Sequence, residues 1–322
     1  MRDHGGDLDR AQALYGGTDW IDLSTGINRT AYPLPDLSPD LWRSLPTSSA
    51  VAGLEQIAAA AYGAPRALAL SGAQAAIQLV PRLDLPGIAA VLSPSYNEHA
   101  AALAAQGWQL RAAPDVDAMA GADLAVIVNP NNPDGRVWSV PELKTLAAQV
   151  GRLVVDESFI DATPEQSLAP ALADLGERVV ILRSFGKFYG LAGLRLGFVL
   201  AGPETDARLR ALAGPWAVSG PAIAVGQVAL ADRDWRDAMT GRLAADAARL
   251  DALAARAGWG LVGGCALFRT YQTDSAEAAQ NRLAQAHIWT RRFPYSATWL
   301  RLGLPGSEGE WARLEACLSI SA

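Results

Sequence analysis

The sequence has few of the residues that build covalent or metal frameworks. Its 322 residues include two cysteines, Cys265 and Cys317, and three histidines, at positions 4, 99 and 287. Two cysteines are too few for a disulfide framework, and neither residue type shows the spacing of zinc ligands. We therefore expect reduced thiols with packing roles and no structural metal site.

Long apolar runs and blocks of one charge are also missing. No uninterrupted stretch of about 18 apolar residues could span a bilayer, and the charged start MRDHGGDLDR does not resemble a secretory signal. The net charge of −6 comes from interleaved acidic and basic residues, without the basic stripe that nucleic-acid-binding proteins carry. These absences predict a cytoplasmic protein that has neither nucleic acid nor a membrane as its partner.

What the chain does have is apolar sequence in a regular order. Half of its residues are hydrophobic, and short apolar runs alternate with helix-like segments, which is typical of a parallel α/β sheet. The runs lie at residues 67–72, 88–94, 124–130, 152–157, 179–184 and 196–202. Alanine-rich helices at 221–231 and 235–257 and two later strands then predict a smaller α+β domain. We expect an amino-terminal arm at 1–40, a large domain at 41–203 and a small domain at 204–322.

Three polar side chains follow strands of this predicted sheet. Asn132 lies in NPNNPDG, Asp156 in VVDESF and Lys187 in SFGKFYG. Ligands of such sheets bind at the carboxyl ends of the strands, so we expect the three to converge there. They suit a Schiff-base cofactor, because a lysine can form the imine, an aspartate can hold a pyridine nitrogen protonated, and an amide can bond the ring hydroxyl.

The motif order resembles that of a known family. SGAQ, PSYNEH, NPNNPDG, VVDESF, SFGKFYGLAGLRLGF and WLRLGLP follow one another as in the fold-type-I pyridoxal-phosphate enzymes. The branch is the one that holds histidinol-phosphate aminotransferases and threonine-phosphate decarboxylases, and HGGDLDRAQALYG with IDLSTGINRTAYPLP is similar to the decarboxylase arm. The resemblance implies a mostly parallel seven-stranded sheet flanked by helices, pyridoxal 5'-phosphate as the cofactor, and a homodimer.

The resemblance also assigns cofactor contacts. Lys187 would carry the cofactor and act as general acid and base, Asp156 would pair with the pyridine nitrogen, and Asn132 would bond the ring oxygen. Further expected contacts come from a glycine turn before a helix, from a stacking ring and from phosphate anchors: Gly72, Ala73, Tyr96, Ser184 and Arg195. We expect Arg195 to be a buried cation at the start of an apolar strand. We expect His99 either to support Asp156 or merely to pack in the interior.

Four residues are assigned to the substrate. Arg301 in WLRLGLP would bind the α-carboxylate, and Arg291 would hold a phosphate, although Arg292 is an adjacent alternative. His4 and Asn28, from the arm, resemble further contacts to a phosphorylated amino acid. The implied reaction is decarboxylation of L-threonine O-3-phosphate to (R)-1-amino-2-propanol O-2-phosphate for cobalamin biosynthesis.

Three positions depart from the family pattern. Phe159 stands where many relatives have a tyrosine that bonds the ring oxygen, which favours the decarboxylase branch. Gly186 replaces a serine or threonine, and Leu45 replaces a tyrosine that reaches the partner's phosphate in a dimer. We therefore expect weaker cofactor binding than is typical.

Other functions stay open at this point. An aminotransferase acting on histidinol phosphate or a related amino acid would use the same residues, although Phe159 and the arm argue against it. A cofactor-binding regulator of transcription would need a DNA-reading domain, and the sequence leaves no room for one before Gly16 or after Trp311. A structural protein without cofactor would make the whole motif set a coincidence.

Overall fold

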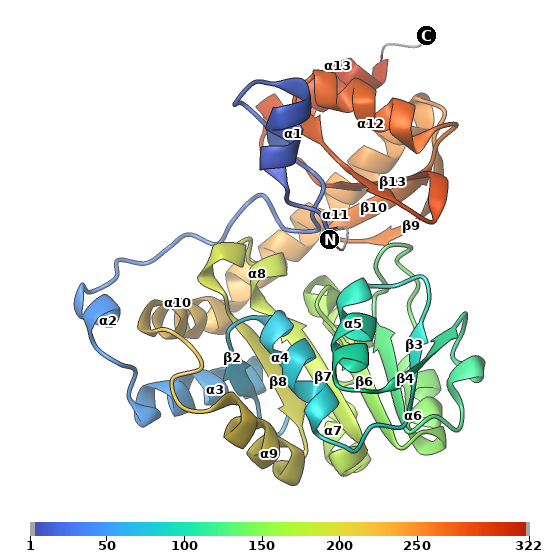
Figure 1. Ribbon diagram of the computed structural model, residues 1–322. Helices are drawn as coiled ribbons and strands as arrows, with labels where there is room; N and C mark the ends of the chain where they lie inside the picture. The colour runs from blue at the N-terminus through green and yellow to red at the C-terminus, as the bar shows by residue number, and fades with distance from the viewer. Residues whose placement is uncertain (1–3, 320–322) are drawn as a thin grey trace. The chain divides into compact units, whose positions relative to one another are not determined.

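The structure is a computed structural model that describes residues 4–319, and the chain divides into two compact units (Figure 1). The larger unit contains Tyr32–Asn132 and Val137–Arg236. The smaller unit contains the chain up to Ala31, Pro133–Arg136 and the chain from Asp237. No helix within the described residues is both long and apolar enough to cross a membrane.

Within the described residues, a seven-stranded sheet forms the centre of the larger unit. Its order is β2-β8-β7-β6-β5-β3-β4, and β8 alone runs antiparallel to both of its neighbours. The strands are β2 Leu68–Leu70, β3 Ile88–Leu92, β4 Gln109–Ala113, β5 Leu124–Val128, β6 Arg152–Asp156, β7 Val179–Ser184 and β8 Gly197–Ala201. The predicted mostly parallel seven-stranded sheet is confirmed.

Helices surround the sheet in the sequence of the larger unit. They are α2 Asp40–Arg43, α3 Ser48–Tyr62, α4 Ala73–Leu79, α5 Asn97–Ala105, α6 Val140–Gln149, α7 Leu172–Leu175, α8 Phe185–Phe188, α9 Pro203–Ala213 and α10 Gly220–Ala231. Figure 1 shows α4 and α5 in front of the strands. Ile77 of α4 and Leu103 of α5 join Val126, Val154 and Leu182 in one buried apolar cluster. Because alternate residues of a strand share a face, Asp156 lies on the same side of β6 as Val154.

The division between the units lies later in the chain than the expected boundary at residue 203. The helices α9 and α10 belong to the larger unit, where they pack on α3: Arg210 forms an ion pair with Glu55, and Gln227 donates to the carbonyl of Ala50. The long helix α11, Arg233–Arg256, carries the chain from one unit into the other.

The smaller unit is built on an antiparallel sheet in the order β12-β13-β10-β9. Its strands are β9 Gly260–Cys265, β10 Phe268–Gln272, β12 Arg291–Phe293 and β13 Ser296–Gly303, and its helices are α1 Leu8–Tyr15, α12 Ala276–Gln285 and α13 Glu308–Ser319. Two short strands, β1 Ile21–Asp22 and β11 Ile288–Trp289, pair in parallel and attach the amino-terminal arm to this unit. An α+β small domain was predicted, and the arm up to residue 31 is part of it.

An aromatic cluster fixes helix α1 in this unit. Tyr15 and Trp20 pack on Trp289, and the Tyr15 hydroxyl donates to Asn281 of α12. Trp20 also packs against His287 at an interplanar angle of 34°. These contacts attach helix α1 and the segment after it to α12 and β11.

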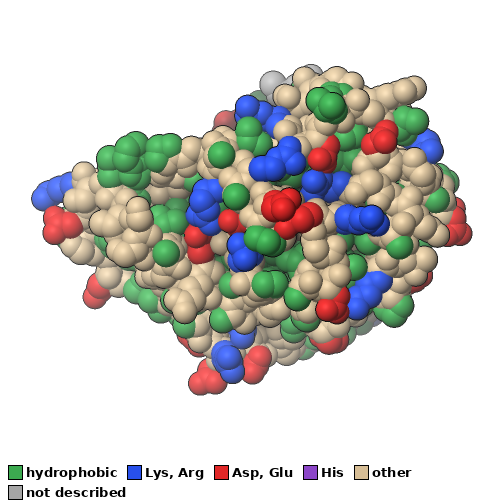
Figure 2. Space-filling model, turned by 90° about the horizontal axis from the view of Figure 1, so that it is seen from below, with side chains coloured by type: hydrophobic (Ala, Val, Ile, Leu, Met, Phe, Trp, Pro, Cys, Tyr) green, Lys and Arg blue, Asp and Glu red, His purple; other side chains and the backbone are tan. Residues whose placement is uncertain are grey.

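On the face of the molecule drawn in Figure 2, acidic and basic side chains are interspersed, and neither sign covers a broad area. This view agrees with the interleaved charges of the sequence, which carry no basic stripe.

Candidate active site

A buried carboxylate, Asp156, ends strand β6 and has three hydrogen-bond donors. His99 Nε2 lies 2.8 Å from Asp156 Oδ2, and both side chains are at most 4 % exposed. The Ser158 backbone N–H donates to Asp156 Oδ1 over 3.0 Å, and the Ser158 hydroxyl donates to the same oxygen. Because a carboxylate only accepts, Nε2 of His99 carries the proton. The expected support of Asp156 by His99 is present.

These donors keep Asp156 ionised. Burial alone would raise its pKa, but the hydrogen bond and the positive charge that His99 can supply, together with the two bonds from Ser158, leave the pKa below the ordinary value of an aspartate. A buried carboxylate that stays ionised in this way can stabilise a positively charged ring nitrogen.

Lys187 lies in the short helix α8, directly after strand β7. Its amine is 5.2 Å from the centre of the Phe159 ring. Phe185 and Trp235 stack on the two sides of Tyr189, two residues beyond the lysine, with ring centres 4.3 and 5.4 Å away. This aromatic stack fixes the backbone that presents Lys187.

Gly186 fits its surroundings only without a side chain. A Cβ there would lie 2.7 Å from the Cα of Ala192, in the loop that follows α8. A serine or threonine at residue 186 therefore does not fit this backbone unless the loop shifts.

The predicted phosphate contacts Gly72 and Arg195 meet at the start of helix α4. Gly72 has φ +82°, and a Cβ on it would lie 2.8 Å from a guanidinium nitrogen of Arg195. A cation thus stands beside the first helical residue, Ala73, where free N–H groups and the helix dipole favour an anion. Ser184, the last residue of β7, precedes α8 and is half-buried.

The expectation of a buried Arg195 is wrong. Arg195 has φ 55°, precedes strand β8 and is exposed, with its Nη1 donating to the carbonyl of Ala192. Its left-handed backbone turns the side chain out of the strand path and towards Gly72. The guanidinium therefore stays hydrated, and its position beside the helix start still suits a phosphate.

Two further cofactor candidates lie in loops of the larger unit. Tyr96 precedes helix α5, and its ring centre is 6.1 Å from that of His99 at an interplanar angle of 82°. Asn132 is buried after β5, in a loop that Asn129 closes by bonding both backbone groups of Trp138. Tyr96 is thus placed next to the histidine that holds Asp156, while contacts of either residue with a cofactor stay a prediction.

The residues of the larger unit fit pyridoxal phosphate. The buried Asp156 would hold the ring nitrogen, Lys187 would bind the reactive carbon, and the Gly72 turn with Arg195 would hold the phosphate. The close approach of the Arg195 guanidinium to Gly72, where a Cβ would lie 2.8 Å from its nitrogen, is an observation independent of the lysine and the aspartate.

The smaller unit brings two arginines together. Arg291 of β12 and Arg301 of β13 are directly opposite in the strand register. Arg301 is 2 % exposed, and its Nη2 donates to the carbonyl of Ser24 over 2.7 Å. Burial first, and then the charge of Arg291, lower the pKa of Arg301 to about 9, so that its cation is disfavoured yet still present at neutral pH. An anion bound here would relieve both effects.

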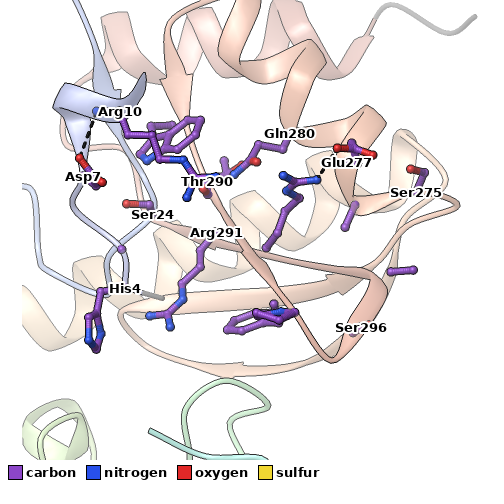
Figure 3. A pocket seen from close by; sticks show the side chains of 17 residues that line it. His4, Asp7, Arg10, Ser24, Ser275, Glu277, Gln280, Thr290, Arg291 and Ser296 are labelled. Carbon is purple, nitrogen blue, oxygen red and sulfur yellow. Dashed lines mark hydrogen bonds and ion pairs between the residues drawn. The ribbon is translucent and has the colours of Figure 1, made fainter. Parts of the chain in front are cut away.

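A cavity of about 450 Å³ lies beside Arg291. It is lined by His4, Ser24 and Arg291, and Figure 3 shows the Arg291 side chain extending towards the level of His4. Arg292 also lines the cavity, where it forms an ion pair with Glu277. The charge of Arg292 is thus paired with Glu277, and the role of Arg291 as a phosphate ligand stays a prediction.

Asn28 has a different local role. It is buried, and its Oδ1 accepts the backbone N–H of Thr30 over 2.9 Å, which closes a turn in the arm. It is not among the residues that line the cavity in the described part of the chain. A substrate contact from Asn28 stays a prediction.

Sequence reasoning missed two residues that organise these clusters. Ser158 bonds Asp156 twice, and Ser24 bonds Arg301. A serine two places after an aspartate is a known signal for a local turn, so Ser158 could have been found. No sequence signal connects Ser24 to a side chain 277 residues away.

Comparison with known proteins identifies the family. The family model described as aminotransferase class I and II matches residues 18–314. The chain is 43 % identical to a threonine-phosphate decarboxylase of Pseudomonas aeruginosa, over 99 % of this chain and 97 % of the relative. It is 42 % identical to a threonine-phosphate decarboxylase of a Sinorhizobium species, over 95 % of each chain.

The solved structures agree in fold. A histidinol-phosphate aminotransferase from Sinorhizobium meliloti, in complex with pyridoxal-5'-phosphate, superposes with a TM-score of 0.84 over 97 % of this chain and 93 % of its own. The two sequences are 21 % identical. That likeness shows the fold.

Proposed function

Because the chain belongs to the class I and II aminotransferase family, we propose that it is a pyridoxal-phosphate-dependent decarboxylase of L-threonine O-3-phosphate. The products are carbon dioxide and (R)-1-amino-2-propanol O-2-phosphate, a precursor for cobalamin. The near-complete match to two threonine-phosphate decarboxylases supports this substrate. The structural observation that carries the proposal is the opposed pair Arg291 and Arg301, which suits a substrate with two acidic groups.

Residues of the larger unit would hold the cofactor and move the proton. Pyridoxal phosphate, when bound, withdraws electrons from the substrate's α carbon so that the bond to the carboxylate can break. Asp156 stays ionised and would fix the ring nitrogen as a cation. Lys187 would return a proton to the α carbon, and the apolar ring of Phe159 lies beside its amine.

Residues of the smaller unit would recognise the substrate. The planar guanidinium of Arg301 can hold the α-carboxylate by two parallel hydrogen bonds, while Ser24 fixes its orientation. Arg291 and His4 line the cavity that would take the phosphate. A substrate that lacks either acid loses one of these charge-assisted contacts.

One assay separates this function from an aminotransferase. Purified protein is incubated with threonine phosphate and, separately, with histidinol phosphate plus 2-oxoglutarate. We expect carbon dioxide from the first mixture and no glutamate from the second. Formation of glutamate without carbon dioxide release would establish the aminotransferase instead.

We also propose that the protein is a homodimer. Leu34, Trp42 and Leu45, in and beside helix α2, are 63, 69 and 65 % exposed. Large apolar side chains this exposed and this close in sequence favour an interface. Sedimentation should give twice the mass of the chain, and Trp42→Ser should shift the protein towards the monomer. The cytoplasmic location expected from the sequence stays a prediction.

A further inference from the structure

Ser24 connects the amino-terminal arm to the buried arginine of strand β13. Its hydroxyl oxygen accepts the backbone N–H of Gly6 over 2.7 Å, and its carbonyl accepts Arg301 Nη2 over 2.7 Å. Ser24 itself is 1 % exposed, so both bonds lie away from bulk water. One bond is made by the side chain of Ser24 and the other by its backbone carbonyl.

Asp22 sets the orientation of this residue. Its Oδ1 accepts the Ser24 backbone N–H over 2.9 Å and the Ser24 hydroxyl over 2.6 Å. The hydroxyl proton is thereby directed to Asp22, which leaves the oxygen lone pairs for the Gly6 N–H. The turn Asp22–Ser24 is therefore held in one arrangement by its own side chains.

The two glycines of the arm fit closely against Ser24. A Cβ on Gly5 would lie 2.2 Å from the Ser24 carbonyl oxygen, the atom that accepts the Arg301 bond. Gly6 has φ +91°, a backbone conformation that residues with side chains rarely adopt. The segment from His4 to Gly6 can therefore pack against Ser24 only if residues 5 and 6 are both glycine.

We propose that Ser24 is a positioning residue that fixes the separation between the phosphate contact His4 and the carboxylate contact Arg301. Through its hydroxyl it anchors Gly6, and hence His4 two residues before it. Through its carbonyl it orients the guanidinium of Arg301. One residue thus sets the distance between two substrate acids, which selects amino acids whose phosphate is separated from the carboxylate by a fixed short chain.

The two contacts of Ser24 have separable effects. Loss of the hydroxyl releases Gly6 and the arm but leaves the carbonyl that Arg301 uses. A methyl group on Gly5 displaces the carbonyl and therefore disturbs Arg301 as well as the arm. The first change weakens recognition of the phosphate, and the second weakens recognition of the carboxylate too.

The test compares Ser24→Ala, Ser24→Thr and Gly5→Ala with threonine phosphate and threonine as substrates. In Ser24→Ala, the ratio of KM for threonine phosphate to KM for threonine should rise about three- to tenfold, the size of one lost neutral hydrogen bond, with kcat for threonine phosphate within about twofold. Ser24→Thr keeps the hydroxyl and should restore the ratio. Gly5→Ala should raise both KM values. An unaltered ratio in Ser24→Ala, or an equal loss for both substrates, overturns the proposal.

A second measurement keeps this inference separate from the proposed function on which it rests. Hydrogen exchange of the peptide that contains Gly6 should become faster in Ser24→Ala and stay slow in Ser24→Thr, whatever the substrate is. If the wild type does not prefer threonine phosphate, the proposed function fails while the exchange result still decides whether Ser24 anchors the arm. If exchange at Gly6 is equally slow in Ser24→Ala, the positioning role is refuted.

Discussion

Arg291 and Arg301 are directly opposite each other on the antiparallel strands β12 and β13. Like charges opposite each other on adjacent strands destabilise a sheet, and burial adds to this cost for Arg301. Phe293 lies near both guanidinium groups, 5.2 Å from that of Arg291 and 6.0 Å from that of Arg301. The arrangement favours a ligand that brings negative charge to the pair.

The first prediction concerns these two arginines. Arg301→Lys keeps a charge but loses the planar fork, so it should raise KM for threonine phosphate and for threonine alike. Arg291→Ala should weaken the binding of threonine phosphate, and not that of threonine, roughly ten- to hundredfold. The reason is that a charge-assisted hydrogen bond contributes on the order of 1.5 to 3 kcal/mol. Steady-state kinetics with both substrates measures the difference.

Arg292→Ala is the matched control for Arg291→Ala. Arg292 is adjacent in sequence but pairs with Glu277, so its removal should change either KM by less than about twofold, as for an exposed ion pair. If Arg292→Ala had the larger effect on threonine phosphate, the assignment of the phosphate contact to Arg291 would be wrong.

The second prediction concerns the pH dependence of the reaction. The pKa of Asp156 lies below its ordinary value because His99 and Ser158 outweigh burial, so the carboxylate stays ionised as the pH falls to mildly acidic values. In His99→Leu, burial is no longer offset by the histidine and the pKa of Asp156 rises. The acid limb of the kcat/KM profile should then move to higher pH.

Two variants calibrate this shift. Ser158→Ala removes one hydroxyl bond and should move the acid limb in the same direction by a smaller amount. His287→Gln changes a histidine of the smaller unit that packs on Trp20, and it should leave the limb in place. An acid limb that is identical in His99→Leu and the wild type would show that Asp156 does not limit activity at low pH.

The sequence predicts much of the larger unit because apolar runs mark its strands and the motif residues directly follow those runs. Strands β2, β5, β6 and β8 are fully buried, and β7 is buried up to Arg183. The apolar runs of β5, β6 and β7 lead to the motifs that hold Asn132, Asp156 and Lys187. Strand β4, Gln109–Ala113, was missed because it lies at the sheet edge, with mostly exposed side chains and no apolar run. The division after residue 236 was missed because α9 and α10 belong to the larger unit through contacts with α3, which composition does not reveal.

The details of the site depend on backbone geometry that sequence patterns do not encode. Arg195 looks like the first residue of an apolar strand, yet its left-handed backbone exposes the side chain beside Gly72. Ser24 contacts Arg301 only because the arm packs on the smaller unit in the folded structure. By contrast, the pairing of His99 with Asp156 was among the expected alternatives, because both residues lie at helix and strand ends that the parallel sheet brings together.

The third prediction concerns Phe159, whose ring faces the Lys187 amine. Phe159→Tyr adds a hydroxyl near the lysine and the expected position of the cofactor's ring oxygen. We expect a shift in the absorbance spectrum of the bound cofactor or in the pH at which that spectrum titrates. A spectrum and titration identical to those of the wild type would mean that residue 159 does not contact the ring.

The fourth prediction concerns the close loop beside Gly186. Gly186→Ser places a Cβ 2.7 Å from the Ala192 Cα and should cost about 1 to 3 kcal/mol of stability, the usual range for overpacking. Gly193→Ser is the control, since a Cβ at this exposed glycine of the same loop meets no atom within 4 Å. Thermal unfolding of both variants measures the difference, and equal melting temperatures would contradict the predicted collision.

The last prediction tests the lysine itself. The wild type should show visible absorbance from the bound cofactor, and borohydride should fix the label to the peptide that contains Lys187. In Lys187→Ala the covalent label should be absent, because Lys144, the chain's other lysine, lies on helix α6 away from the strand ends that carry the site. Asp156→Asn provides the complement: it keeps Lys187 and therefore the label, but a neutral amide no longer stabilises a protonated ring nitrogen, so most turnover should be lost. Mass spectrometry of the reduced, digested proteins locates the label, and carbon dioxide release measures turnover. A borohydride-fixed label in Lys187→Ala, or near wild-type turnover in Asp156→Asn, would require different residues for the two roles.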